Sequence, residues 1–205
     1  MEKHWLDETF FEFDDAIFRA VYQMEESLPF LRGFARFISY FGDCLGLFFL
    51  VSTLLLCLFR KTRKVGIIVG VAIVFDAIII NFGLKEIIER PRQFWDKLSP
   101  YYHMWLEAKG TWHDSYSFPS GHTGIATAFG VGLFLGCNKK YSWAFLFIPV
   151  LMAWSRVALF VHYPTDVIAA FILIFATTIG AYYLCTKVLF RLKIVERLTE
   201  GDSLF

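Results

Sequence analysis

The stretch from Val65 to Leu84 reads Val-Gly-Ile-Ile-Val-Gly-Val-Ala-Ile-Val-Phe-Asp-Ala-Ile-Ile-Ile-Asn-Phe-Gly-Leu, and Asp76 is its one charged residue. A helix of ~20 mostly apolar residues is long enough to cross the hydrocarbon core of a bilayer. Four more apolar runs of similar length cover residues 38–59, 120–137, 141–161 and 166–190. The sequence therefore predicts an all-α integral membrane helical bundle with about five transmembrane helices.

The composition of the whole chain agrees with a membrane location. Of its 205 residues, 57% are hydrophobic and 19% are aromatic, whereas soluble domains are about 45–50% apolar. The net charge of +1 argues against nucleic acid as a main partner. The four cysteines show no CxxC or Cys/His metal spacing, which indicates inert buried thiols. We expect a single membrane domain over residues 1–205.

The N-terminal part of the chain has a different pattern. Between residues 9 and 37, aromatic and aliphatic residues alternate with acids at helical spacing. This pattern is typical of an amphipathic helix that lies in the membrane interface. We assign residues 1–35 to this N-terminal segment. A sixth, imperfect span is the alternative interpretation.

Lysine and arginine in short loops predict the orientation of the spans, because cytoplasmic loops carry an excess of these residues. With five spans, three basic clusters fall on one face: Arg60, Lys61, Arg63 and Lys64, then Lys139 and Lys140, then Lys187, Arg191, Lys193 and Arg197. The loop at 85–119 and the turn at 162–165 then face outward. These outer segments hold every polar group that could carry chemistry.

The first outer segment is Lys85-Glu-Ile-Ile-Glu-Arg-Pro-Arg92. Lysine and arginine neutralise phosphate, and arginine can do so through two parallel hydrogen bonds. Cations on the outer face run against the usual charge bias, and an anionic ligand would explain them. Taken alone, the segment also fits a basic patch that binds lipid headgroups.

The second outer segment is Phe118-Pro-Ser-Gly-His122, which opens the run at 120–137. Ser120 is a favourable N-cap residue. Backbone N–H groups at a helix start bind anions, and Gly121 would let a phosphate approach closely. His122 would then lie in the first turn, beside that anion site. An ordinary capped helix is the simpler alternative.

The third outer segment runs from Ser155 to Asp166 and contains Arg156 and His162. A guanidinium among apolar neighbours is costly unless it is paired, so Arg156 is a candidate functional residue. Asp166 follows His162 by four residues and could accept the N–H of the imidazole. That contact would fix the tautomer and leave the other ring nitrogen free as a base or nucleophile.

Together these segments resemble the signature of the type 2 phosphatidic acid phosphatase (PAP2) superfamily of membrane lipid phosphatases. That signature is Lys, six residues, Arg-Pro; then Pro-Ser-Gly-His; then Ser-Arg, five residues, His, three residues, Asp. The chain matches it from Lys85 to Asp166 with the spacing intact. It departs at Gln93, where the family has proline. Because of the spacing we assign the first arginine of the motif to Arg92 and keep Arg90 as a helper.

The resemblance implies a catalytic mechanism. His162 would attack phosphorus and form a phosphohistidine, Asp166 would orient it, and His122 would protonate the leaving oxygen. The groups that would hold the phosphoryl oxygens are Lys85, Arg92, Ser120, Gly121 and Arg156. No metal or other cofactor is expected. His113 matches no motif, and we expect it at the surface.

The resemblance also implies a substrate, a lipid phosphate in the bilayer. Our first choice is undecaprenyl diphosphate, the cell-wall carrier lipid, hydrolysed at the extracytoplasmic face of the cell membrane. Phosphatidylglycerol phosphate, phosphatidic acid and lipid A phosphates are the alternatives. A lipid transporter or scramblase would need the cations but not the His–Asp pair. A haloperoxidase-like activity with vanadate is disfavoured by the spans. The oligomeric state is left open.

Overall fold

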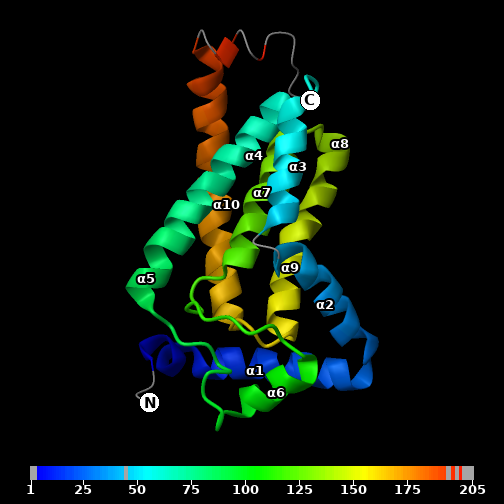
Figure 1. The fold of residues 1–205 in the computed structure, drawn as a ribbon, viewed down its shortest axis with the longest axis vertical. Coiled ribbons are helices and arrows are strands. Elements are labelled where there is room, and N and C mark those ends of the chain that lie inside the picture. The colour runs from blue at the N-terminus through cyan, green and yellow to red at the C-terminus, as the bar shows by residue number, and fades with distance from the viewer. Residues whose placement is uncertain (1–3, 44–45, 193–194, 197–198, 200–205) are drawn as a thin grey trace.

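The computed structural model describes residues 4–43, 46–192, 195–196 and 199. Every regular element within these residues is a helix, which confirms the predicted all-α class (Figure 1). The main helices are α1 (Trp5–Ser27), α2 (Phe30–Asp43), α3 (Leu47–Leu58), α4 (Arg63–Asp76), α5 (Lys85–Ile88), α6 (Pro100–Ala108), α7 (Gly121–Gly136), α8 (Lys139–Ser142), α9 (Phe147–Ala158) and α10 (Pro164–Lys187). A π-helical stretch, Ala77–Leu84, joins α4 to α5, and short 3-10 turns lie at Trp143–Leu146 and Leu189–Arg191.

Among the described residues, three unbroken helical stretches are long and apolar enough to cross a membrane: Arg63–Ile88, Lys139–Ala158 and Pro164–Arg191. The predicted span at 38–59 falls on two helices, α2 and α3, which meet at an angle of 53° and together are long and apolar enough for one broken span. Gly46 precedes α3 with φ +69°, a conformation that glycine adopts without strain. The helix expected at 120–137 has 16 residues. The count of five spans stays a prediction.

Helix α7 lies inside the bundle, packed against α4, α9 and α10. Its small residues explain this position, because they let helix backbones approach closely. A Cβ at Gly132 would lie 2.9 Å from Val69 of α4, and one at Gly130 would lie 2.6 Å from the carbonyl oxygen of Phe145. A Cβ at Gly124 would lie 2.0 Å from Oδ1 of the buried Asp76.

The three sequence segments meet at one end of the bundle. The C-terminal ends of α5 and α9 and the N-terminal ends of α7 and α10 all lie at the lower end in Figure 1. The described basic loops, with Arg60–Lys64 and Lys139–Lys140, lie at the opposite end. Lys193 and Arg197 are outside the described residues. The predicted separation of basic loops from the motif segments is therefore present in the fold.

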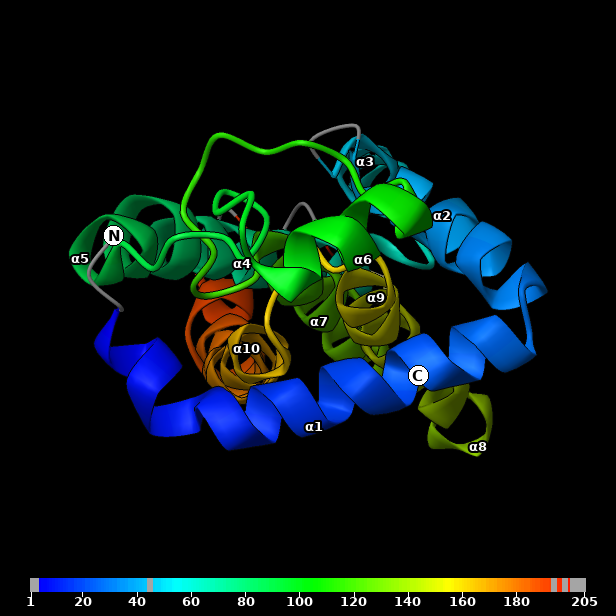
Figure 2. The ribbon, with the colours of Figure 1, turned by 90° about the horizontal axis from the view of Figure 1, so that it is seen from below.

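Helices α1 and α6 lie across the motif end of the bundle (Figure 2). The two are joined by hydrogen bonds from Tyr101 to Asp15 at 2.7 Å and from Tyr22 to Glu107 at 2.9 Å. The amphipathic helix ends at Ser27, so residues 30–35 belong to α2 rather than to the N-terminal segment.

Helix α1 carries exposed aromatic residues, namely Trp5, Phe10, Phe11 and Phe13. Its inward side carries Phe18 together with the buried acids Asp14 and Glu25. The described cysteines, Cys57, Cys137 and Cys185, are free thiols, and Cys44 is outside the described residues.

Candidate active site

His162 lies in the turn between α9 and α10 and is 1% exposed. Its Nδ1 atom is 3.5 Å from Oδ2 of Asp166 and 3.5 Å from the hydroxyl oxygen of Ser117. Its Nε2 atom is 3.4 Å from Nη1 of Arg92. Because a guanidinium can only donate, Nε2 accepts and the ring proton resides on Nδ1, toward the carboxylate. The lone pair of Nε2 therefore points toward the cationic side of the site.

Asp166 lies in the first turn of α10 and is fully buried. Its Oδ1 atom accepts a hydrogen bond from Nη1 of Arg90 at 2.7 Å. Its Oδ2 atom accepts from the backbone N–H of Tyr163 at 3.0 Å and from the Ser117 hydroxyl. A carboxylate that is bound on both oxygens cannot rotate freely, so Asp166 holds the ring of His162 in one orientation.

Two buried arginines surround His162. Arg92 donates from Nε to the carbonyl oxygen of Ser115 at 2.7 Å and from Nη1 to that of Val161 at 2.6 Å. These bonds tie the 113–117 segment to the start of the His162 turn. Arg156 is fully buried and donates from Nη2 to the hydroxyl of Ser39 on α2. The guanidinium of Arg92 is thus held in place by neutral acceptors and keeps its charge for an anion.

Burial and these cations set the protonation state of His162. Burial lowers its pKa well below the usual value, and the charges of Arg92, Lys85 and Arg156 lower it further. The imidazole is therefore neutral at pH 7, the form required of a nucleophile. Burial, with a smaller effect of Arg156, lowers the pKa of Arg92 to about 10 against the opposing charge of Asp166. Arg92 remains a cation at neutral pH.

The start of α7 faces Lys85. Ser120 caps this helix, as predicted, and its hydroxyl oxygen accepts the N–H of Thr123 at 3.4 Å. A Cβ on Gly121 would lie 3.2 Å from Oδ1 of Asn81 and 3.7 Å from Nζ of Lys85. The helix-start amides and the ammonium group therefore face the same space, which suits an anion.

His122 packs against α2. A Cβ on Gly42 would lie 2.4 Å from Cδ2 of His122 and 3.2 Å from Cε of Met152. The ring of His113 is 5.7 Å, centroid to centroid, from that of His122. His113 is half-buried, and its assignment to the surface rather than to the catalytic groups stays a prediction. The 113–117 segment folds back over the site, which brings His113 to His122.

The two arginines of the first segment have different surroundings. Arg90 is fully buried and donates to three carboxylates, those of Asp7, Asp14 and Asp166. Arg92 is the one that contacts His162. This geometry favours Arg92 as the phosphate ligand, a role that stays a prediction.

Residues missed by the sequence analysis are Ser117 and Asp14, which bond to Asp166 and to Arg90 respectively. No motif marks either residue.

The family model of the PAP2 superfamily matches residues 64–189. The chain belongs to the PAP2 superfamily. An undecaprenyl-diphosphatase from Sulfolobus acidocaldarius is 36% identical over 144 residues, which are 70% of this chain and 65% of that protein. The chain thus spans slightly less than two thirds of the length of this relative. No solved structure matches it.

All eight residues assigned to the site from the sequence lie within the PAP2 match, whereas α1 and α2 lie outside it. Together with its apolar helices, the match identifies a helical membrane protein. Within the described ranges, no group of three or more His, Cys, Asp or Glu residues could hold a metal ion. The residues of the PAP2 signature in this chain are cations, two imidazoles, one carboxylate and the Ser-Gly start of α7.

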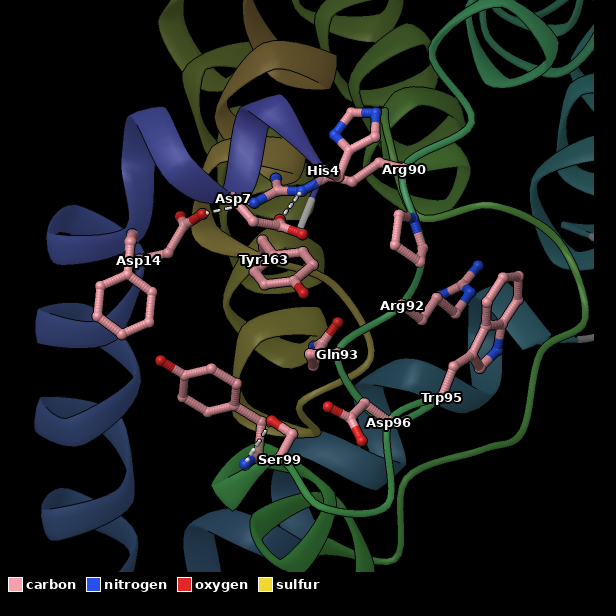
Figure 3. A pocket seen from close by; sticks show the side chains of 13 residues that line it. His4, Asp7, Asp14, Arg90, Arg92, Gln93, Trp95, Asp96, Ser99 and Tyr163 are labelled. Atoms are coloured by element: carbon pink, nitrogen blue, oxygen red, sulfur yellow. Dashed lines mark hydrogen bonds and ion pairs between the residues drawn. The ribbon is translucent and has the colours of Figure 1, made fainter. Parts of the chain in front are cut away.

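In the part of the chain that the structure describes, two hollows lie beside the residues assigned to the site. A cavity of about 160 Å³ opens between α1, the segment that follows Arg90, and Tyr163 (Figure 3). Of the residues assigned to the site, Arg92 alone lines it, so it adjoins the cluster rather than containing it. An apolar groove of about 230 Å³ lies between α2, α3 and α9, and its lining includes Phe49 and Met152.

The contact between Gly42 and His122 gives a sharp test of the site. We expect Gly42→Ala to lower kcat for phosphate release by about 10- to 100-fold, because a new Cβ must displace the imidazole. The matched control is Gly33→Ala in the same helix, where a Cβ meets nothing within 4 Å. Both changes raise helix propensity. Equal kcat values in the two variants would contradict this position of His122.

Proposed function

We propose that this protein is a metal-independent membrane lipid phosphatase that works through a phosphohistidine on His162. The supporting observation is the arrangement around that ring. Nδ1 faces the fixed carboxylate of Asp166 at 3.5 Å, and Nε2 faces the guanidinium of Arg92 at 3.4 Å. A neutral imidazole with its lone pair directed at a cationic pocket can attack a phosphorus atom held there.

In the first step Nε2 of His162 bonds to the terminal phosphorus as the bond from that phosphorus to the oxygen joining it to the rest of the lipid breaks. In a lipid diphosphate this is the bridging oxygen between the two phosphorus atoms. His122 gives its proton to that leaving oxygen. The imidazolium that forms is stabilised by Asp166 through Nδ1–H. In the second step His122 takes a proton from water, the water oxygen bonds to phosphorus, and the phosphorus–nitrogen bond breaks. Inorganic phosphate leaves, and His162 returns to its neutral form.

The cations carry the charge of the transferring group. Lys85, Arg92 and Arg156 would contact the phosphoryl oxygens together with the amides at Ser120 and Gly121. Fixed donors in a buried site stabilise charge that develops in the transition state more strongly than water does. In many phosphoryl-transfer enzymes Mg²⁺ supplies this charge.

The substrate that we propose is undecaprenyl diphosphate. The similarity to the Sulfolobus protein, which is named an undecaprenyl-diphosphatase, supports this choice. The apolar groove between α2, α3 and α9 also supports a substrate with a long apolar chain. The groove adjoins the site, because Met152 in its lining and the ring of His122 both face Gly42. A chain in the groove would place its linked oxygen on the side of the proposed acid. Phosphatidylglycerol phosphate, phosphatidic acid and lipid A phosphates share the phosphate chemistry.

We further propose that the site faces the extracytoplasmic side of the cell membrane. The described basic loops lie at the end of the bundle opposite to the turn between α9 and α10, which holds His162, and such loops are retained in the cytoplasm. The exposed aromatic residues of α1 at the site end suit the headgroup layer.

The deciding experiment is phosphate release by purified protein in lipid vesicles, with EDTA present, from four substrates. These are a polyprenyl diphosphate, phosphatidylglycerol phosphate, phosphatidic acid and a lipid A phosphate. We expect the polyprenyl diphosphate to give the highest kcat/KM, with EDTA leaving the rate unchanged. Strong inhibition by EDTA would contradict the metal-independent mechanism, and a different preferred lipid would overturn the substrate assignment.

A further inference from the structure

Helix α1 lies outside the PAP2 match, yet its acids reach the catalytic turn. Asp14 is 3% exposed. Its Oδ1 accepts the backbone N–H of Thr165 at 2.9 Å, and its Oδ2 accepts the Thr165 hydroxyl at 2.8 Å. The same Oδ2 accepts from Nη2 of Arg90 at 2.9 Å. One carboxylate of α1 therefore binds both the first turn of α10 and the arginine beside it.

Arg90 links these groups to Asp166. Besides Asp14, it donates from Nε to Asp7 at 2.8 Å and from Nη1 to Asp166 at 2.7 Å. A fourth bond goes from Nη1 to the hydroxyl of Thr165 at 2.8 Å. Its guanidinium also lies 3.6 Å from the centre of the Tyr163 ring. A guanidinium has five N–H groups, so these contacts occupy Arg90 and leave it unsuited to substrate.

We infer that Arg90 and Asp14 are positioning residues that hold Asp166 in its catalytic orientation. This inference rests on the proposed function, in which Asp166 orients His162. Arg90 binds Oδ1 of Asp166 and so leaves Oδ2 directed at Nδ1 of His162. Asp14 and Asp7 in turn fix the guanidinium plane. The interfacial helix is thereby part of the support of the active site.

The charges in this network explain why two α1 acids are needed. Arg90 brings one positive charge to three carboxylates, all of them buried or largely buried. If Asp166 were its only partner, the guanidinium would be free to turn toward that carboxylate and compete with His162. Asp7 and Asp14 bind Nε and Nη2 of the guanidinium and so leave Nη1 for Asp166. The charged or titratable groups that act electrostatically on His162 are Arg92, Lys85, Arg156, His122 and Asp166.

The test compares Asp14→Asn with Asp15→Asn in the same helix. Asp15 is paired with Arg19 at 2.6 Å and with Tyr101 at 2.7 Å, outside the Arg90 network. We expect Asp14→Asn to lower kcat about tenfold with KM within about twofold of the wild type, because substrate contacts are untouched. Asp15→Asn keeps both constants within about twofold. Asp14→Glu, which restores the charge, recovers part of the lost kcat.

The pH dependence of kcat/KM distinguishes a positioning role of Asp14 from a general loosening of the fold. Loss of the negative charge at Asp14 leaves the field at His162 more positive, which disfavours its protonated form. The acid limb of kcat/KM should therefore move to lower pH by a few tenths of a unit in Asp14→Asn. Asp15→Asn should leave it in place. Ionisation of the substrate contributes equally to both variants and cancels.

Asp7→Asn gives a second test of the same network. The Asp7 side chain is 20% exposed, so removing its charge disturbs packing less than the change at the buried Asp14 does. If Asp14→Asn does not fold, the same direction of change in Asp7→Asn carries the test. Equal kcat values and equal acid limbs for the Asp14 or Asp7 variant and the Asp15 variant would overturn the inference. Absence of phosphate release from the wild-type protein would instead overturn the proposed function.

Discussion

The His162→Gln variant is expected to lose phosphate release by at least about 10⁴-fold, as is usual when a nucleophile is removed. A glutamine amide can still accept from Arg92, but it cannot form the bond to phosphorus. The lipid should bind with a Kd close to that of the wild type, because Lys85, Arg92 and Arg156 remain. The measurements are single-turnover phosphate release and binding of the lipid to vesicle-reconstituted protein.

The matched control is His103→Gln, since His103 is an exposed imidazole of α6. This variant should keep wild-type activity. Phosphate release that survives in His162→Gln would contradict the mechanism in which His162 is the nucleophile. If lipid movement across vesicles also continued in that variant, the transporter or scramblase interpretation would replace it.

The second large effect is expected at His122, and its size should depend on the leaving group. A lipid monophosphate expels an alkoxide, which needs a proton, whereas a lipid diphosphate expels a phosphate ester, which is stable without one. We expect His122→Gln to lower kcat/KM for the monophosphate by about 10²- to 10⁴-fold, the range typical of general acid catalysis. The loss for the diphosphate should be much smaller.

The comparison uses kcat/KM because this constant reports the steps up to formation of the phosphohistidine. Hydrolysis of that intermediate is common to both substrates. His113→Gln is the appropriate companion variant, since its ring lies 5.7 Å from that of His122 but has no part in the proposed proton transfer. Equal losses for the two substrates in His122→Gln would show that His122 is not the acid.

Local rules were sufficient for the ends of the helices that carry the site. Ser120 caps α7, as its position before the apolar run predicts, and Pro164 occupies the first helical position of α10, where proline is favoured. The π-helical stretch from Ala77 and the bend before Gly46 were not predicted, because apolar composition sets the length of a span but not its path.

The support of the site was harder to predict than the motifs. Asp14 lies in a helix whose alternation of acids and aromatics was assigned to an interface, and only tertiary packing turns that acid inward to Arg90. Ser117 stands in an irregular segment with no periodicity, so nothing in its neighbourhood indicates the bond to Asp166. His113 reaches His122 through the same segment.

The most direct test is to trap the phosphoryl group on the protein. His122→Gln, incubated with a lipid diphosphate labelled in its terminal phosphate and quenched in alkali, should retain label, because this variant forms the intermediate and hydrolyses it slowly. We predict that the label is stable in alkali, labile in acid, located on the peptide that contains His162, and absent from the His122→Gln, His162→Gln double variant. Label on another residue, or label that persists in the double variant, would contradict the account.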